Sequence, residues 1–191
     1  MKRLPLILAV GMICIGAQAE PFTVDTSHAG ITFTVKHLMI SDVSGKFKTF
    51  QGSVDYNLAE KTLVSIEGWI DAASIDTSSE GRDNHLKAAD FFNVEKFPRI
   101  LFKSTAVEKT DEENTFKVKG MLNILGKEHE VVLPVKIAGP IDDQRGNKRI
   151  GLSCDTKLNR RDLGITNSPA AMIGDEVSIK ISAEAMYKPA S

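Results

Sequence analysis

The sequence contains few cysteines and few aromatic residues other than phenylalanine: two Cys, one Trp and two Tyr occur in 191 residues. Cys14 lies in an apolar N-terminal run that we expect to be removed, so Cys154 is left without a disulfide partner. The chain also lacks a surplus of charge, because 24 Lys and Arg residues are balanced by 25 Asp and Glu residues. Such a chain gives no sign of binding nucleic acid or an anionic membrane surface. Its stability must therefore come from a packed core.

Motifs for catalysis and metal binding are missing as well. The sequence has no GxSxG, P-loop or GxGxxG pattern, and His28, His37, His85 and His129 show no HxH or HExxH spacing. Cys154 lies on an apolar face, where a buried and inert thiol is the common outcome. We therefore predict no metal site, no cofactor and no conventional hydrolase or phosphoryl-transfer apparatus. A Ser/His/Asp set assembled by the fold stays open as an alternative.

The one long apolar run lies at the N-terminus. Met1-Lys2-Arg3 is followed by apolar residues from Leu4 to Ile15 and then by Ala17-Gln18-Ala19, which is the order of a secretory signal peptide. The run is shorter than the roughly 20 residues that span a bilayer, and the bulky Ile13 before Cys14 argues against a lipoprotein signal. We predict a cleaved signal peptide over residues 1–19 and one exported domain over residues 20–191.

Alternation with a period of two residues dominates the exported part and predicts strands with one apolar and one polar face. Glycine joins the apolar residues at two of these positions. The apolar faces are formed by Ile31, Phe33 and Val35; Val64, Ile66, Gly68 and Ile70; Phe116, Val118, Gly120, Leu122 and Ile124; Val131, Leu133, Val135 and Ile137; Ile150, Leu152, Cys154 and Leu158; and Val177, Ile179, Ile181, Ala183 and Ala185.

Turn signals separate these runs at residues 57–62, 111–114, 126–127, 140–147 and 167–175. The pattern predicts about eight or nine antiparallel strands, several of them longer than the typical five or six residues. A two-sheet sandwich and a closed barrel both bury one face of such strands. Long strands with short connections favour the up-and-down barrel, in which eight strands enclose a lumen for one ligand.

Residues 74–92 interrupt the alternation. Thr77 and Glu80 have the spacing of a capping box, which predicts a helix that begins near Thr77 and ends around Asp90. Its narrow apolar edge contains Leu86 and Ala89. We predict that this helix covers one end of the barrel, with Leu86, Phe91 and Phe92 packed inward and Phe97-Pro98 leading into the next strand.

Four segments carry a resemblance to a known family: VDTSHAGITFTVKHLMISDVSGKFKTFQGSVDY, SIDTSSEGRDNHLKAADFFNVEKFPRILFKST, KVKGMLNILGKEHEVVLPV and LNRRDLGIT. They resemble the YceI-like family of periplasmic, lipocalin-like, polyisoprenoid-binding proteins over essentially the whole exported chain. The resemblance implies an all-β fold, an extended antiparallel eight-stranded barrel with one short helix at one end. It also implies a periplasmic location, no cofactor and no catalytic residues. Lys36 stands where many members have arginine, so the resemblance does not imply a bidentate head-group contact at this position, because lysine cannot reproduce the guanidinium fork.

The apolar faces and the resemblance together give candidate ligand-binding residues. Those expected to line the lumen are Phe33, Val35, Phe50, Val54, Tyr56, Ile66, Ile70, Leu86, Phe91, Phe92, Phe102, Phe116, Val118, Leu133 and Ile179. A filled barrel core is the alternative for each of them. Weaker candidates for contact with a polar head group, taken from the matching motifs, are His37, Arg82, His85, Arg160 and Asp162. Arg160 and Asp162 could instead form an ion pair that closes a loop.

Two hypotheses for function follow. The first is a carrier that holds a long isoprenoid or other fatty chain in its lumen, and the burial of such a chain supplies the affinity. The second is an enzyme that acts on the bound lipid with His37 or His85 as general base. The carrier is compatible with a transient membrane contact and with a homodimer, although no contiguous apolar stripe in the sequence marks a dimer face.

Overall fold

The computed structural model describes residues 18–189; most of the predicted signal peptide lies outside them, and its cleavage stays a prediction. Within residues 18–189, no helix combines the length and hydropathy that crossing a bilayer requires. The elements in chain order are β1 (Glu20–His37), β2 (Ser41–Phe47), β3 (Phe50–Asn57), β4 (Thr62–Asp71), η1 (Ala72–Ser74), β5 (Ile75–Asp76), α1 (Glu80–Lys87), β6 (Arg99–Lys109), β7 (Thr115–Ile124), β8 (Lys127–Asp142), β9 (Lys148–Asn159) and β10 (Ile173–Tyr187).

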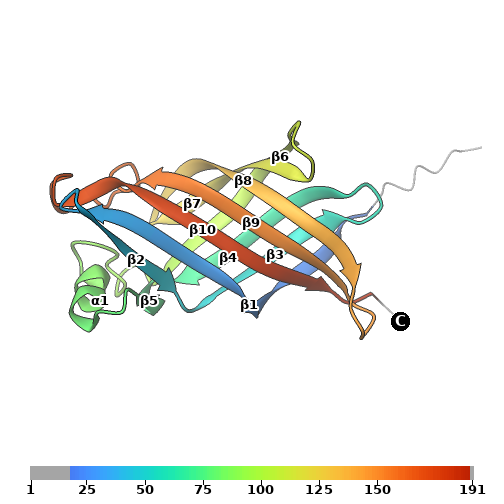
Figure 1. The fold of residues 1–191 in the computed structure, drawn as a ribbon, viewed down its shortest axis with the longest axis horizontal. Helices are drawn as coiled ribbons and strands as arrows, with labels where there is room; N and C mark the ends of the chain where they lie inside the picture. The colour runs from blue at the N-terminus through green and yellow to red at the C-terminus, as the bar shows by residue number, and fades with distance from the viewer. Residues whose placement is uncertain (1–17, 190–191) are drawn as a thin grey trace, which may run out of the picture.

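The long strands form a closed antiparallel barrel. Around the wall the order is β10-β9-β8-β7-β6-β4-β3-β1, and β1 pairs again with β10, which closes an eight-stranded circle. The barrel is elongated, with α1 at one end and the C-terminus at the other (Figure 1). Closure removes the free edges along most of the wall. The predicted eight-stranded barrel with one short helix is therefore confirmed.

The wall is irregular along β1. Its first residues, Glu20–Thr23, pair with β3, whereas pairing from Ile31 onward is with β2. Between these two ladders β1 has paired residues on the β10 side only, where a bulge separates Asp25 from Ala29. The short β5 extends the edge of β2 at Phe47 and Lys46. The barrel wall is thus interrupted next to residues 24–30.

Two apolar clusters fill the barrel near its ends. The cluster away from α1, which we name the distal core, contains Phe22, Val54, Tyr56, Leu63, Phe116, Val118, Val135, Ile137, Ile150, Cys154 and Ala185. The cluster beside α1, which we name the plug-end core, contains Phe47, Ala72, Ile75, Phe91, Ile100, Ile124 and Ile165. Most strand members of both clusters occupy the inward positions of the alternation, so the period of two residues assigned most faces correctly. Val64 is an exception: it was predicted on the inward face but is 50 % exposed, because an irregularity in the β3–β4 ladder pairs Leu63 with Tyr56 and buries Leu63 instead.

The predicted capping box is wrong. Helix α1 begins at Glu80 after Ser79, whose side chain makes no capping hydrogen bond. Instead the amide and hydroxyl of Thr77 donate to Asp83 Oδ1 at 2.9 and 2.5 Å. The reason is the left-handed conformation of Ser78, with φ of 61°, which turns the chain before the helix. The helix also ends at Lys87, earlier than predicted, because Ala88 is extended.

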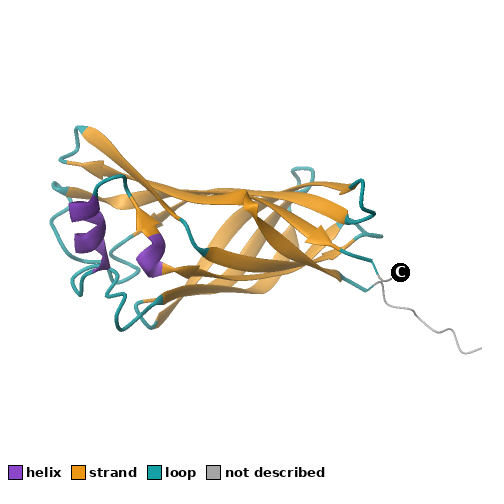
Figure 2. Ribbon diagram, turned by 90° about the horizontal axis from the view of Figure 1, so that it is seen from below, coloured by secondary structure: helices purple, strands orange, loops and turns teal. Residues whose placement is uncertain are grey.

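The segment after α1 closes one end of the barrel (Figure 2). Phe91 is a buried member of the plug-end core, and Leu86 and Phe92 pack against that core. The Phe92 ring meets Phe47 edge-on with 5.9 Å between ring centroids. Phe97 and Pro98 lead into β6, which begins at Arg99. The predicted plug is confirmed, and we keep that name for residues 80–98.

Candidate functional site

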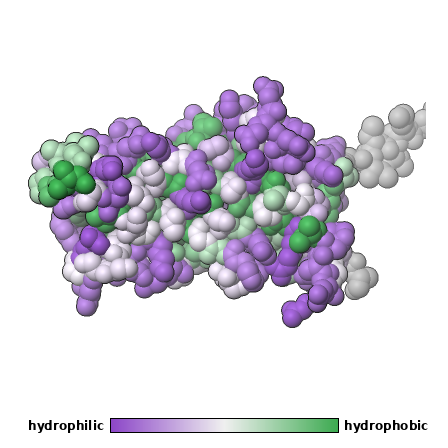
Figure 3. Space-filling model, viewed as in Figure 1, coloured by the Kyte–Doolittle hydropathy of each residue, from purple (hydrophilic) through white to green (hydrophobic). Residues whose placement is uncertain are grey.

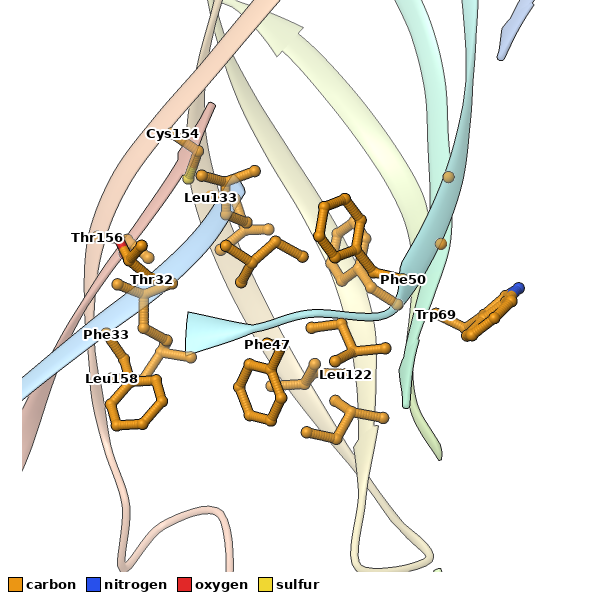
Figure 4. Close-up of a pocket in the computed structure, with 18 of the residues that line it drawn as sticks. Thr32, Phe33, Phe47, Phe50, Trp69, Leu122, Leu133, Cys154, Thr156 and Leu158 are labelled. Atoms are coloured by element: carbon orange, nitrogen blue, oxygen red, sulfur yellow. The ribbon is translucent and has the colours of Figure 1, made fainter. Parts of the chain in front are cut away.

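A cavity of about 350 Å³ lies inside the barrel, between the plug and the distal core. That size is within the range of roughly 300–1,000 Å³ found for small-molecule pockets. All eight barrel strands contribute to its wall, together with Leu86, Phe91 and Phe92 of the plug. The close-up in Figure 4 shows side chains such as Phe33, Leu133 and Leu158 directed into this space from different strands.

Most of the predicted lumen residues line this cavity. Their side chains come from the inward positions of the strands and from the plug, and they are almost entirely hydrocarbon. They are Phe33, Phe50, Val54, Ile66, Ile70, Leu86, Phe91, Phe92, Phe102, Leu133 and Ile179. Such a lining favours an apolar ligand, because a polar group placed there would find few hydrogen-bond partners.

Four predicted residues are outside the lining. Tyr56, Phe116 and Val118 belong to the distal core, with exposed fractions of 2 % or less. Their large side chains fill the barrel instead of facing open space. Val35 lies on β1 beyond Phe33, towards the plug-end rim, and is half-buried. Alternation identifies the inward face of a strand but not the position of a residue along the barrel axis. It could therefore not distinguish the residues that line the cavity from those that fill the distal core.

Other lining residues were not among the predicted ones. Leu152, Cys154 and Leu158 of β9 line the cavity, and their alternation in the sequence could have identified them. Leu163 and Ile165 line it from the loop between β9 and β10, where no periodic signal exists. Burial raises the pKa of the Cys154 thiol to about 11, so this group stays protonated and behaves as part of the apolar wall.

Two glycines in the wall leave room for the aromatic rings of Phe33 and Phe102. Gly45 of β2 is paired with Phe33 of β1, and a Cβ at Gly45 would collide with the Phe33 ring. A Cβ at Gly120 of β7 would lie 2.5 Å from the Phe102 ring. Because a larger residue at either position would push the ring into the lumen, these glycines keep the cavity open.

The wall is thin where the β1 ladder is interrupted. Ala29 and Gly30 on one side and Gln51 and Gly52 on the other all line the cavity. A Cβ added at Gly30 would meet no atom within 4 Å. The cavity therefore reaches the gap between the two parts of the wall, and its surface there is mostly main chain and small side chains.

Two charged residues, Glu67 and Arg160, contribute to the cavity lining. Glu67 is exposed, whereas Arg160 is buried. Arg160 is only 4 % exposed and its guanidinium pairs with Asp175 at 3.0 Å. Its nitrogens also donate to five main-chain carbonyls, those of Gly174, Ile165, Asn167, Ser168 and Ile173. The ion pair with Asp162, which the sequence left open as an alternative, is not formed: Arg160 pairs with Asp175, and Asp162 is exposed. The N–H groups of Arg160 are thus already used in hydrogen bonds to the loop between β9 and β10.

The other polar candidates lie outside the lining. Arg82 donates to the hydroxyl and carbonyl of Thr77, both at 2.8 Å, and is exposed on α1. His85 contacts Asp90 at 2.9 Å, and its ring lies edge-on to Phe91 with 4.9 Å between centroids. His37 is exposed at the end of β1. These side chains are grouped around the plug end without meeting in one site.

A Ser/His/Asp cluster does occur, on the polar face of β1. Ser27 Oγ lies 2.6 Å from Asp25 Oδ1, and His28 Nδ1 lies 3.1 Å from Ser27 Oγ and 3.0 Å from Asp25 Oδ2. A catalytic triad needs the serine on one ring nitrogen and the carboxylate on the other, whereas here both use Nδ1. Asp25 and Glu184 also approach His28 closely enough to hold a cation. Arg149 already bridges these two carboxylates, at 3.2 and 3.0 Å.

Comparison with known proteins supports the resemblance found in the sequence. The profile of the YceI-like domain matches residues 22–185. A relative from Azotobacter vinelandii strain DJ, named UPF0312 protein, is 33 % identical over 191 residues, which cover 96 % of this chain and 97 % of that protein.

Solved structures have the same fold. The Campylobacter jejuni YCEI protein is 28 % identical with a TM-score of 0.74, and the match covers 99 % of this chain and all of that one. A polyisoprenoid binding domain from Saccharophagus degradans, at 13 % identity, has a TM-score of 0.65 over 87 % of this chain and 98 % of that domain. At this low identity the second likeness concerns the fold alone.

Proposed function

This chain belongs to the YceI-like family, and from that premise we propose that it binds one long-chain amphiphile, an isoprenoid or other fatty chain, in its barrel. The observation that carries this proposal is a cavity inside a closed barrel whose lining is almost entirely hydrocarbon. A related fold in Saccharophagus degradans is described as a polyisoprenoid binding domain, which agrees with the same class of ligand.

The energetics support a chain-like ligand. Each methylene-sized group that leaves water contributes about 0.8 kcal/mol, so ten such groups give a gross of about 8 kcal/mol. Association costs reduce this figure, but no dense network of polar contacts is needed. In this proposal the tail contacts are made by the lining residues, such as Phe33, Phe102 and Leu133.

The position of the head group follows from the polar side chains. Arg160 is fully engaged by carbonyls and Asp175, so it holds the loop and is a poor partner for a ligand head. His37, Arg82, His85 and Asp162 are exposed near the plug end. We infer that the polar head lies at that end, near these side chains and in contact with water, while the tail occupies the lumen.

The same proposal includes a location and a role. The N-terminal sequence has the order of a cleavable signal peptide, and we propose that the exported domain acts in the periplasm. There it would carry or store a lipid that water does not dissolve. Binding without chemistry is favoured over an enzyme, because His37 and His85 lie outside the cavity lining.

The test is to identify what the protein holds and to block the cavity. Protein purified without its leader should release a long-chain lipid on organic extraction, detected by mass spectrometry. Leu133→Trp fills the lumen and should lower both occupancy and the affinity for a fluorescent farnesyl derivative at least tenfold. The matched control is Val132→Trp, at the adjacent exposed position on the outer face, which should bind like the wild type.

Two outcomes contradict the proposal. An empty wild-type protein that also refuses the farnesyl probe would exclude lipid binding. Equal loss of binding in both tryptophan variants would show that the cavity is not the site. Conversion of a bound lipid, abolished by His37→Ala or His85→Ala, would favour the enzyme instead.

A further inference from the structure

Four large apolar side chains are exposed together at the plug end of the barrel. Leu38, Met39 and Ile40 form the turn between β1 and β2, with exposed fractions of 47, 60 and 84 %. Met172, 49 % exposed, lies in the loop before β10, and its carbonyl accepts a hydrogen bond from the Leu38 amide at 2.8 Å. Figure 3 shows hydrophobic residues gathered at this end of the molecule. We name these four residues the apolar tip.

The backbone of the tip is in an unfavourable conformation for its residues. Leu38 and Met39 have φ of 50° and 58°, and the Ile40 amide closes the turn on the His37 carbonyl at 3.2 Å. Hairpin turns of this kind strongly prefer Asn-Gly, because both central residues need positive φ. Bulky side chains held in this region cost stability, and such strain concentrates at functional sites. The chain thus has large apolar residues where stability alone favours small polar ones.

Two ion pairs flank the apolar tip. Lys36 and Asp42, on the two strands that lead to the turn, form an ion pair at 3.0 Å. Near the other loop, Arg161 pairs with Asp175 at 2.6 Å. These two pairs neutralise the charges on the strands that lead to the turn and next to the other loop, and the tip itself offers only apolar side chains for contact.

The small area of the apolar tip and its position on the barrel indicate which kind of partner it can bind. A specific protein partner buries roughly 800 Å² per side, more than four side chains on two loops can cover. A few apolar side chains on a projecting turn suit shallow insertion into a bilayer interface instead. The loop that carries Met172 also contributes Leu163 and Ile165 to the cavity lining. The tip is therefore continuous with the cavity wall at the plug end.

We propose that the apolar tip inserts into the surface of a lipid bilayer and holds the plug end of the barrel against it. The proposal rests on the lipid-binding function above, since it places the plug where a membrane lipid would enter or leave. Helix α1 and the aromatic pair Phe91-Phe92 then face the bilayer side. Because the contact is apolar, binding is independent of anionic lipid and of salt.

The experiment is flotation of the purified exported domain with vesicles of phosphatidylcholine, with and without phosphatidylglycerol, at low and raised salt. The wild type should float with both vesicles at both salt concentrations. The triple variant Leu38→Asn, Met39→Gly, Ile40→Ser removes the apolar side chains and gives the turn its preferred residues. Its partition into vesicles should fall about tenfold or more, with no loss of thermal stability.

The matched control is Ile141→Ser, which removes a 63 % exposed isoleucine from β8 at the opposite end of the barrel and should float like the wild type. Binding of the fluorescent farnesyl derivative in vesicle-free solution separates the two proposals. The tip variant should keep this binding, and Leu133→Trp should lose it yet still float.

Several results would overturn the tip proposal alone. A wild type that binds the farnesyl probe but does not float would exclude the membrane contact and leave lipid binding intact. Flotation that requires phosphatidylglycerol and disappears at raised salt would mean an electrostatic contact elsewhere. Sedimentation that shows a dimer lost in the tip variant, without flotation of the wild type, would identify the tip as a contact between two copies.

Discussion

At the residue scale, Arg160 connects the cavity to the loop that closes it. Its buried guanidinium donates to five carbonyls between Ile165 and Gly174 and pairs with Asp175. A planar group with donors on three nitrogens can hold a loop of this kind from inside, which a lysine cannot do. The loop in turn supplies Ile165 to the plug-end core and Met172 to the apolar tip.

We therefore expect Arg160→Lys to lower the free energy of unfolding by about 2–3 kcal/mol, because buried carbonyls would lose their donors. Arg161→Lys is the control, since Arg161 is partly exposed and should cost about 1 kcal/mol or less. Urea denaturation followed by circular dichroism measures both. Equal costs for the two variants would mean that the buried carbonyl contacts of Arg160 contribute little.

At the scale of elements, the sequence predicted the inward faces of the strands, but it did not predict position along the barrel or the arrangement of the loops. Alternation placed Phe33, Phe102 and Leu133 correctly on inward faces, because burial of one face enforces the period of two residues. It could not indicate that Phe116 fills the barrel while Phe33 borders open space, since depth depends on the neighbours around the wall. Ile165 and the tip lie in loops, where position is set by long-range contacts that leave no local pattern.

The start of α1 illustrates the same limit. Thr77 and Glu80 have capping-box spacing, yet the positive φ of Ser78 directs Thr77 to Asp83. The capping-box spacing applies only where the backbone between the two residues has its usual conformation. The left-handed Ser78 lies between Thr77 and Glu80, so the spacing does not apply here. The helix was predicted correctly, but the side chain that accepts the hydrogen bonds of Thr77 is Asp83 and was not predicted.

The helix therefore offers a paired test. Asp83→Ala removes the acceptor for the amide and hydroxyl of Thr77 and should lower the free energy of unfolding by about 1 kcal/mol. Amide exchange over residues 77–88 should increase with it. Glu80→Ala, at the other position of the predicted box, should leave both quantities near the wild type. A larger loss of stability in Glu80→Ala than in Asp83→Ala would support the capping box instead.

At the scale of the whole molecule, two partly exposed acidic clusters, around Asp25 and Asp143, connect stability to pH. Hydrogen bonds from Asn147 hold the pKa of Asp143 well below its usual range. Hydrogen bonds from Ser27, and then from His28 and Arg149, do the same for Asp25. Groups with a depressed folded pKa stabilise the protein above the unfolded pKa of about 4 and cease to do so as the pH falls towards the folded pKa.

We therefore expect the urea midpoint to be nearly constant above pH 5 and to fall steeply below about pH 4. Asp143→Asn should be less stable at neutral pH and should show a shallower acid slope, because one of the titrating groups is gone. Urea titrations across this pH range measure both variants. A midpoint in the wild type that is unchanged down to pH 2 would rule out these carboxylates as the source of acid sensitivity.

The pairing of β1 with β10 gives the barrel a circular strand order. Thr23 is opposite Met186, so the start of β1 and the end of β10 are neighbours at the end of the barrel away from the plug (Figure 1). A short linker could join Tyr187 to Glu20, and new ends could be opened in the exposed turn between β6 and β7 without the loss of any ladder. By the same geometry, a tag or carrier protein fused just before Glu20 or just after Tyr187 is attached at the end of the barrel opposite the apolar tip. Such fusions leave the plug end free for immobilised or oriented samples.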